Sequence, residues 1–297
     1  MKIYNSLTKT VEEFLAINPP EVGMYTCGPT IYDRKHIGNF RTYTLSDLLV
    51  RALTYEGYKV THIMNFTDVG HLTGDNEGDA DTGVDRLVKA AIRERKTAWD
   101  VAKEYEKLFL DDFEKMGLLN PAKFVKATDH IKEQIDLIKK LEEKGFVYKI
   151  SDGVYFDTVS YEKNTGNKYG ELSNLDSIKE GARVEPNPEK KNPRDFALWK
   201  FSPVGETRDM EWESQWGIGF PGWHIECSAM SMKYLGESFD LHIGGEDLRS
   251  THHPNEIAQS EGATGKKFVN YWVHGAFVLI DGQRMSTSKG NNYNVRD

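Results

Sequence analysis

The fold is decided by residues 22–68, which read VGMYTCGPTIYDRKHIGNFRTYTLSDLLVRALTYEGYKVTHIMNFTD. Residues 22–27 form an apolar run that predicts a buried strand, and residues 58–68 are rich in β-branched side chains and predict a second strand. Between them, a Gly-Pro turn precedes a helical pattern that begins at residues 36–39. A strand, a helix and a strand at this spacing indicate a right-handed βαβ unit in a parallel sheet. Ligands bind such sheets at the carboxyl ends of the strands, where we expect to find Cys27, Gly28 and Thr67.

The composition is that of a globular protein, with 38% hydrophobic and 28% charged residues in a chain of 297. The sequence has no run of ~18 apolar residues that could span a membrane, and charges interrupt its N-terminal segment too early for a signal peptide. We therefore expect a cytoplasmic protein, in which a disulfide between its two cysteines is disfavoured. The formal net charge of -8 argues against a broad basic surface for nonspecific nucleic-acid binding, although residues 187–200 and 284–289 are locally basic.

The remaining segments extend this pattern into one α/β domain with an insertion. Residues 70–86 are acidic and glycine-rich, lack the spacing of an EF-hand, and predict a solvated loop. Helices are expected at 95–117, 129–145, 222–236 and 251–265, a β-hairpin at 146–158, and strands at 239–247 and 270–281. We expect a Rossmann-like parallel sheet built from residues 1–117 and 216–297, with residues 118–215 inserted as an α+β connective subdomain.

The two cysteines of the chain both lie where they could hold a metal ion. Cys27 follows the first predicted strand, and Cys227 lies near the other end of the chain. Further on, His252 and Glu256 are four residues apart and share one face of a predicted helix. Two thiolates, one imidazole and one carboxylate form a tetrahedral zinc set, and a carboxylate ligand is more typical of catalytic than of structural sites. His253 is a competing ligand, and each cysteine taken alone would be an ordinary core residue.

Two further segments have the composition of phosphate-binding sites. The sequence HIGN at residues 36–39 opens the first predicted helix, whose N-terminus offers free N–H groups and a positive dipole end. Gly38 allows a nucleotide to approach the backbone, while His36 and Asn39 can donate hydrogen bonds to phosphate oxygens. Residues 284–291, RMSTSKGN, combine cations and hydroxyls in a glycine-ended loop suited to holding a leaving pyrophosphate. Taken alone, each segment is also consistent with an ordinary helix start or polar loop.

In their order along the chain, five segments resemble the catalytic region of the cysteinyl-tRNA synthetases, which are class I aminoacyl-tRNA synthetases. They are MYTCGPTIYDRKHIGN, NFTDVGH, GWHIECSAM, GGEDLRSTHHPNEIAQSE and RMSTSKGN, and they cover essentially the whole chain. The resemblance implies activation of L-cysteine by ATP to cysteinyl-adenylate, with Mg²⁺ on the phosphates, followed by transfer to tRNA(Cys). It also implies one zinc ion, which binds the thiolate of the substrate and rejects serine. The implied zinc ligands are Cys27, Cys227, His252 and Glu256.

The same resemblance implies roles for the residues that match the motifs of the family. The cysteine substrate would be held by Gly28, Thr30, Thr67, Trp223 and Asp247. The ATP site would be lined by His36, Gly38, Asn39, His224, Gly244, Gly245, Arg284, Ser286, Thr287 and Ser288. The catalytic residues would be His36, Asn39 and Lys289.

The chain departs from the KMSKS loop of the family, which here reads RMSTS at residues 284–288. The second lysine of that loop usually contacts ATP and is Thr287 in this chain, so Lys289 is the expected substitute. The sequence stops soon after this loop, where family members continue into helical domains that contact tRNA, and we expect a fragment of a longer protein. Two alternatives remain open, namely an amino-sugar ligase like that of the mycothiol pathway and a catalytically impaired zinc-binding paralogue. We expect a monomer.

Overall fold

The computed structural model describes residues 1–70, 72, 85–173, 187–203, 205 and 208–297. Its central element is a five-stranded sheet in the order β11-β10-β3-β4-β5, in which every neighbouring pair is parallel. The strands are β3 (Glu21–Thr26), β4 (Lys59–Phe66), β5 (Lys123–Lys126), β10 (Phe239–Gly245) and β11 (Val269–Gly275). The predicted Rossmann-like α/β fold is therefore confirmed, including the unit formed by β3, helix α1 (Ile37–Tyr55) and β4.

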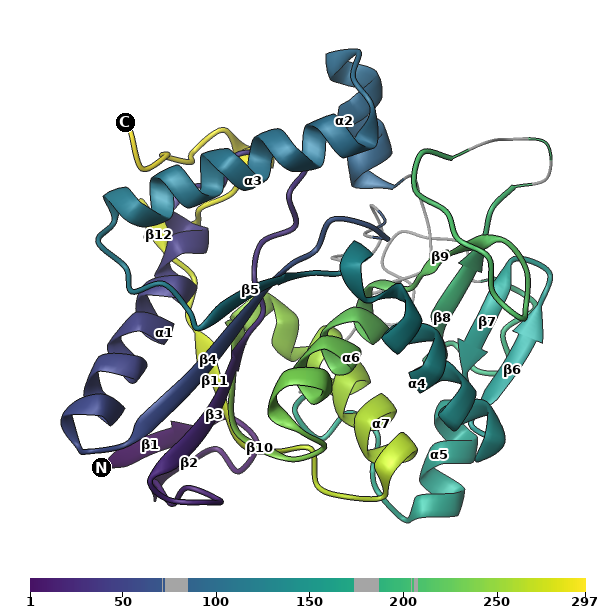
Figure 1. The fold of residues 1–297 in the computed structure, drawn as a ribbon, viewed down its shortest axis with the longest axis horizontal. Helices are drawn as coiled ribbons and strands as arrows, with labels where there is room; N and C mark the ends of the chain where they lie inside the picture. The colour runs from purple at the N-terminus through teal and green to yellow at the C-terminus, as the bar shows by residue number, and fades with distance from the viewer. Residues whose placement is uncertain (71, 73–84, 174–186, 204, 206–207) are drawn as a thin grey trace.

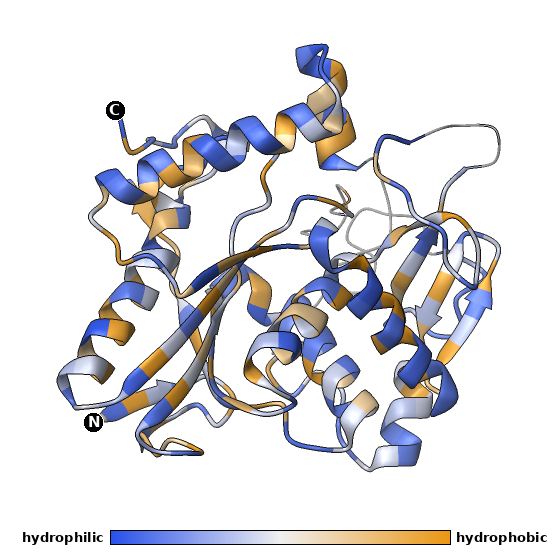
Figure 2. Ribbon diagram, viewed as in Figure 1, coloured by the Kyte–Doolittle hydropathy of each residue, from blue (hydrophilic) through white to orange (hydrophobic). Residues whose placement is uncertain are grey.

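Helices cover both faces of the central sheet (Figure 1). Helices α1 and α3 (Ala98–Lys115) lie on one side, and α4 (Ile131–Glu143), α6 (Trp223–Leu235) and α7 (His252–Thr264) lie on the other. Hydrophilic and hydrophobic residues alternate along α3 and α4, which bury one side of each helix and expose the other (Figure 2). Because both faces are covered, β10 buries its first six residues, and the polar side chains among them need partners inside the protein.

The strand order reverses between β3 and β10. From β3 the chain continues through β4 to β5 on one side, while β10 and β11 extend the sheet on the other side. Helix α1, which follows β3, and helix α7, which follows β10, lie on opposite sides of the sheet (Figure 1). A reversal of this kind opens a crevice at the carboxyl ends of the two central strands, which is the usual ligand site of open parallel sheets.

A smaller antiparallel sheet lies beside the central one (Figure 1). Its strands are β6 (Val147–Ile150), β7 (Gly153–Phe156), β8 (Phe196–Phe201) and β9 (Gly219–Pro221), so the hairpin predicted at 146–158 is confirmed. Together with α4 and α5 (Thr158–Thr165), this sheet encloses a hydrophobic cluster that includes Phe156 and Trp199. The same cluster takes Ile225 and Ala229 from α6, so one helix contributes to the cores of both sheets.

The division of the chain at residues 118 and 215 stays a prediction, and β5 bears on its first boundary. This strand lies inside the predicted insertion, yet it pairs with β4 in the central sheet, with Ile63 opposite Lys123 and Phe66 opposite Lys126. Any inserted unit therefore begins after Lys126. The pattern of the sequence does not reveal β5, because a four-residue strand flanked by lysines carries too little hydrophobic signal.

The single strand predicted at 270–281 is wrong. Strand β11 ends at Gly275, and a separate hairpin follows, made of β12 (Leu279–Ile280) and β13 (Gln283–Arg284). The chain leaves the sheet where it passes α1 closely, since a Cβ on Gly275 would lie 3.0 Å from Thr42 Oγ1. The hairpin turns at Asp281 and Gly282, whose φ values of 49° and 76° suit a type I′ turn.

Other elements complete the fold. The helices predicted at 95–117, 129–145, 222–236 and 251–265 are confirmed as α3, α4, α6 and α7. The sequence pattern does not predict β1 (Lys2–Asn5), β2 (Thr10–Glu13), α2 (Arg86–Glu94), η1 (Thr128–His130), η3 (Glu246–Arg249) or η4 (Thr287–Lys289).

Most of the loop expected at 70–86 lies outside the described residues. Among the helices that the structure describes, none has the length and apolar character to cross a membrane.

Candidate active site

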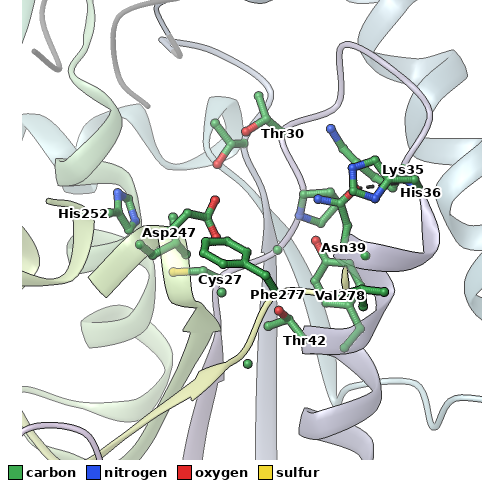
Figure 3. Close-up of a pocket in the computed structure, with 18 of the residues that line it drawn as sticks. Cys27, Thr30, Lys35, His36, Asn39, Thr42, Asp247, His252, Phe277 and Val278 are labelled. Carbon is green, nitrogen blue, oxygen red and sulfur yellow. Dashed lines mark hydrogen bonds between the residues drawn. The ribbon is translucent and has the colours of Figure 1, made fainter. Parts of the chain in front are cut away.

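A pocket opens at the carboxyl ends of β3 and β10, where the strand order reverses. Figure 3 shows Cys27 and His252 toward one end of this pocket and Lys35 and His36 at the opposite end. Segments from both halves of the chain contribute to its walls. The predicted site residues that line the pocket are Cys27, Gly28, Thr30, His36, Gly38, Asn39, Thr67, Trp223, Cys227, Gly245, Asp247, His252, Arg284 and Ser286.

Cys27 and Cys227 meet in this pocket, although they are 200 residues apart. Cys27 follows β3, and Cys227 lies in the second turn of α6. Both thiols are free, and their Sγ atoms are 3.7 Å apart. Two thiolates on one tetrahedral zinc, each ~2.3 Å from the ion, would be separated by about 3.8 Å, whereas a disulfide requires about 2.05 Å. The spacing of the sulfurs therefore fits a shared metal ion rather than a disulfide.

His252 and Glu256 complete a set of four donors. They lie on α7, where a spacing of four residues brings both side chains to one face. His252 Nε2 is 3.1 Å from Glu256 Oε1, and one ligand atom from each of the four residues lies within 4.8 Å of the others. All four residues are at most 6% exposed. Two sulfurs, one imidazole nitrogen and one carboxylate oxygen at this spacing suit zinc.

The donors determine one another's ionisation. Burial opposes the charge on Glu256, but the rings of His242 and His252 outweigh it and lower the pKa of Glu256 to about 2. Burial also opposes the charged form of His252, yet the carboxylate of Glu256 raises the pKa of His252 to about 10. Burial would raise the pKa of Cys227, but the thiol of Cys27 and the charge on His252 lower it to about 6. Burial and the neighbouring Cys227 raise the pKa of Cys27. Glu256 and Cys227 thus favour their negative forms beside the charged His252, and a cation such as Zn²⁺ would favour the thiolate of Cys27 as well.

A second donor set lies within the same 4.8 Å limit and comprises Cys27, His242, His253 and Glu256. His253 is the competing ligand expected from the sequence, and its Nε2 is 3.5 Å from Cys27 Sγ. Its Nδ1, however, is 2.8 Å from His274 Nε2 and forms a hydrogen bond there. Among the described residues, His242 and His253 do not line the pocket, whereas three members of the first set do. The first set also offers two thiolates instead of one, so we favour it as the zinc site.

His224 and Gly244, which we expect to line an ATP site, pack against other side chains in this structure, and their role there stays a prediction. His224 is 1% exposed, and its Nδ1 lies 2.9 Å from His252 Nδ1. This hydrogen bond leaves His252 Nε2 to face the thiols and Glu256, so His224 orients a ligand from behind. Gly244 packs on the ring of His253, where an added Cβ would lie 2.5 Å from Cε1. Neither residue is among the described residues that line the pocket.

Asn65, in β4, organises the strand ends beside the thiols. Its Oδ1 accepts a hydrogen bond from Gly28 N at 2.9 Å, and its Nδ2 donates to Thr67 Oγ1 at 3.2 Å. Position 28 requires glycine, because a Cβ there would lie 1.6 Å from Asn65 O. Thr30 and Thr67 pair through an isolated β-bridge. The predicted Gly28, Thr30 and Thr67 therefore lie together, and Asn65 connects two of them.

Trp223 and Asp247 flank the same end of the pocket. The ring of Trp223 packs on His252, with centroids 4.4 Å apart. Asp247 lies on η3, and its carboxylate is 3.9 Å from the guanidinium of Arg284. Arg284 in turn lies over the ring of Phe277, 3.9 Å from its centroid, and Figure 3 shows Phe277 beside Asp247. A half-exposed carboxylate beside the thiol cluster is suited to receive an ammonium group.

The start of α1 forms the opposite end of the pocket. Asn39 Oδ1 accepts a hydrogen bond from His36 N at 3.2 Å, which fixes the first turn of the helix. Gly38 gives the ring of His36 room, since a Cβ would lie 2.9 Å from that ring. Burial lowers the pKa of His36, and the positive charges of Lys35 and Arg284 lower it further. A neutral ring whose Nδ1 has no partner in the described structure can hydrogen-bond to a ligand.

The RMSTS loop reaches the pocket only in part. Arg284, Met285 and Ser286 line the pocket. Thr287 and Lys289 belong to η4, are exposed, and are not among the described lining residues. The side chain of Ser288 lies outside the described structure. In this conformation Lys289 lies outside the described wall of the pocket, so its expected role in place of the missing lysine stays a prediction.

Comparison with known proteins identifies the family. The family model described as tRNA synthetases class I (C) catalytic domain matches residues 13–297. This chain belongs to that family. It is 48% identical over 293 residues to the cysteine–tRNA ligase of Treponema denticola, a match that covers 98% of this chain and 58% of that protein. It is 49% identical over 294 residues to cysteine–tRNA ligase 1 of Burkholderia lata, covering 98% of this chain and 60% of that protein.

Similarity of fold extends to another class I synthetase. Methionyl-tRNA synthetase of Mycobacterium tuberculosis, solved in complex with methionyl-adenylate, is similar with a TM-score of 0.66 and 14% sequence identity. The match covers 93% of this chain and 61% of that one. At this identity it supports the fold alone. The chain thus spans about three fifths of the length of the curated relatives, 58% and 60% for the two above.

Three features of this family member were not expected from its sequence. Asn65 links strand ends, and Lys35 lines the pocket next to His36. Histidines from β10 and β11, namely His242 and His274, contact residues of the two candidate metal sets. Lys35 and Asn65 lie next to motifs in the sequence, and this position could have indicated that they belong to the site. The histidines carried no such signal, because only the packing of the sheet on α7 brings them near the thiols.

Proposed function

We propose that this chain activates L-cysteine with ATP, forming cysteinyl-adenylate and pyrophosphate, and that the protein it belongs to transfers the cysteinyl group to tRNA(Cys). One observation supports the proposal most directly. Two thiols and an imidazole, with the carboxylate of Glu256 behind them, lie at one end of a pocket whose other end is a helix N-terminus. A site that reads a thiol and a site that binds phosphate in one cavity suit an amino acid that must meet ATP. Membership of the class I (C) family supports the same reaction.

We propose zinc as the resident ion, held by Cys27, Cys227, His252 and Glu256. When bound, zinc would accept the substrate thiolate as a ligand, which a serine hydroxyl replaces poorly. The residues of the chain supply the rest of the selectivity. Trp223 packs on His252 and closes one side of the thiol end, and the carboxylate of Asp247 is suited to the substrate ammonium group.

In the proposed reaction, a carboxylate oxygen of cysteine attacks the α-phosphorus of ATP. A new P–O bond forms, and the bond to the bridging oxygen of pyrophosphate breaks. His36, Asn39 and the N–H groups of the first turn of α1 would stabilise the negative charge that develops on the phosphate oxygens. Arg284 and Ser286 would face the leaving pyrophosphate, with Mg²⁺ as the expected counter-ion. The terminal adenosine hydroxyl of tRNA would then take the cysteinyl group and release AMP.

Cysteine-dependent exchange of labelled pyrophosphate into ATP tests the activation step. We expect exchange with cysteine and only background exchange with serine, because the two substrates differ only in the atom that the thiol end receives. Cys227→Ser should reduce the exchange by about 100-fold or more, since it removes one zinc ligand. A zinc-loaded wild-type protein without cysteine-dependent exchange would refute the proposal and favour a catalytically impaired paralogue.

The acceptor is tested separately. The relatives are named cysteine–tRNA ligases, which supports tRNA over an amino sugar. We therefore expect the protein to charge tRNA(Cys) and to leave glucosamine-type acceptors unmodified. Modification of an amino sugar without charging of tRNA(Cys) would leave the proposed activation step intact and contradict the proposed acceptor. The monomeric state and the cytoplasmic location stay predictions.

A further inference from the structure

Lys35 lies in the pocket at the end formed by α1. It directly precedes His36 and is one of the residues that line the pocket. Figure 3 shows Lys35 beside His36, on the side of the pocket opposite His252. Its ammonium group is thus at the end of the cavity that we assign to phosphate, far from the thiol cluster.

The ammonium group of Lys35 has an aromatic neighbour but no counter-ion from the described chain. Its Nζ lies over the ring of Tyr32, 4.5 Å from the centroid. Arg86 lies near the same ring, 5.5 Å from the centroid, and donates a hydrogen bond to Tyr32 Oη at 3.3 Å. In the part of the chain that the structure describes, no carboxylate forms an ion pair with Lys35. A half-buried cation that acts only at a distance with Asp33, and forms no ion pair, is unfavourable, so the site is suited to an anion that comes from outside the protein.

Burial also affects the ionisation of the Lys35 ammonium group. It lowers the pKa of Lys35 to about 8, with Asp33 opposing the change and Arg86 adding to it. A bound polyphosphate would reverse this effect, because a nearby anion favours the ammonium form.

The other cations near the pocket are less suited to the phosphate chain. Thr287 occupies the position at which the family carries the second lysine of its loop, and Lys289 is exposed outside the pocket. Arg284 lines the pocket, but its guanidinium lies over Phe277 and 3.9 Å from Asp247, toward the amino-acid end. Among the described lining residues, Lys35 is therefore the lysine available to a polyphosphate beside His36.

We propose that Lys35 binds the pyrophosphate portion of ATP, and that it supplies the ammonium group which the loop lacks at Thr287. The role rests on the proposed function, since ATP is the nucleotide that this function requires. In activation, Lys35 would hold the β- and γ-phosphate oxygens while the carboxylate attacks the α-phosphorus. It would then neutralise charge on the departing pyrophosphate.

Binding measurements test this role without depending on cysteine. Isothermal titration calorimetry would give the affinities of the wild-type protein for Mg-ATP, tripolyphosphate and AMP. Lys35→Met keeps the length of the side chain and removes its charge, and should weaken Mg-ATP and tripolyphosphate by about tenfold or more while sparing AMP. Lys35→Arg should restore binding to within about threefold, because it keeps the cation. Lys103→Met, on the exposed face of α3, is the matched control and should change nothing.

Each other outcome has a definite meaning. Unchanged ATP affinity in Lys35→Met, an equal loss of AMP affinity, or a loss in Lys289→Met instead would overturn the proposal. Lys35→Gln, checked with Lys35→Met by thermal unfolding, provides a second neutral variant if the first is unstable. A wild-type protein that binds ATP but shows no cysteine-dependent exchange would refute the proposed function and leave the role of Lys35 to the binding data. A wild-type protein that binds neither ATP nor tripolyphosphate would refute both.

Discussion

Glu256 Oε2 accepts a hydrogen bond from His242 Nε2 at 2.8 Å, and this contact turns the other carboxylate oxygen toward the thiols. Glu256 Oε1 lies 3.7 Å from Cys27 Sγ and 3.1 Å from His252 Nε2. His242 is itself fixed by its place in β10 and by stacking on Trp272, with ring centroids 4.5 Å apart and planes 18° apart. The strand therefore determines which carboxylate oxygen a metal ion would meet.

Replacing His242 should weaken zinc binding without removing a ligand. His242→Phe keeps a ring on Trp272 and removes the donor to Glu256, so the carboxylate would lose its fixed orientation. We expect the affinity for zinc to fall by about 10- to 100-fold, as measured by competition with a chelator. His62→Phe is the control, because His62 is also buried and hydrogen-bonded, to Thr26, but lies outside the cluster. Equal zinc affinities in His242→Phe and the wild type would refute this positioning role.

Removal of zinc should destabilise the whole chain. The four proposed ligands join the segment after β3 to α6 and α7, which are far apart in the sequence. Because binding free energy at such a site adds to folding free energy, chelation should lower the melting temperature by about 5–10 °C. The measurement is thermal unfolding with and without chelator, and re-addition of zinc should restore the original value. Cys227→Ser should melt at the lower temperature in both conditions, and a zinc-depleted wild type with an unchanged melting temperature would contradict the prediction.

The parts of the site that depend on local sequence could be predicted. Cys27 and His36 follow from one βαβ unit, because such a unit brings a strand end and a helix start to the same edge of the sheet. His252 and Glu256 follow from the period of the helix. Cys27 and Cys227 could be predicted to meet because they are the two cysteines of the chain, and because two thiols near the carboxyl edge of the sheet suit one metal ion.

The parts that depend on tertiary packing could not be predicted. His224 occurs within a motif, but its ring orients His252 from behind because α6 and α7 pack together. Lys289 and Lys35 are both lysines beside a motif, and only the path of the chain shows which one faces the pocket. The same limit applies to β5, whose four residues join a sheet that the local pattern gives no reason to extend.

The buried carboxyl of Asp68 should make stability depend on pH. Asp68 accepts hydrogen bonds from Thr128 N at 3.0 Å and from Thr128 Oγ1 at 2.6 Å. Burial raises its pKa to about 6, although these hydrogen bonds oppose the change. Because the value in an unfolded chain is lower, about 3.9, the folded state binds the proton more tightly. The stabilising contribution is complete below about pH 4 and is lost as the pH rises through about 6.

Comparison with Asp68→Asn isolates this effect. Between about pH 5 and pH 7.5, the free energy of unfolding of the wild type should fall by about 1–2 kcal/mol more than that of the variant. Urea denaturation at both pH values measures the difference. Parallel changes in the two proteins would show that Asp68 ionises alike in the folded and unfolded states.

The titration of Lys35 should appear in the affinity for ATP. The charged and titratable groups that act on its ammonium are Asp33 and Arg86, and His36 is the neighbouring ring. Burial lowers the pKa of His36 below its usual value, so this ring does not change charge in alkaline solution. Since burial lowers the pKa of Lys35 to about 8, the ammonium form, which we propose binds phosphate, is lost as the pH rises through this value. The affinity of the wild type for Mg-ATP should therefore fall by about tenfold between about pH 7 and pH 9.5.

Two variants serve as controls for this pH dependence. Lys35→Arg should keep its affinity for Mg-ATP over this range, because guanidinium remains protonated, and Lys35→Met should bind Mg-ATP weakly throughout. Calorimetric titrations across the range measure all three proteins, and the same pH dependence in all of them would assign the alkaline loss to another group.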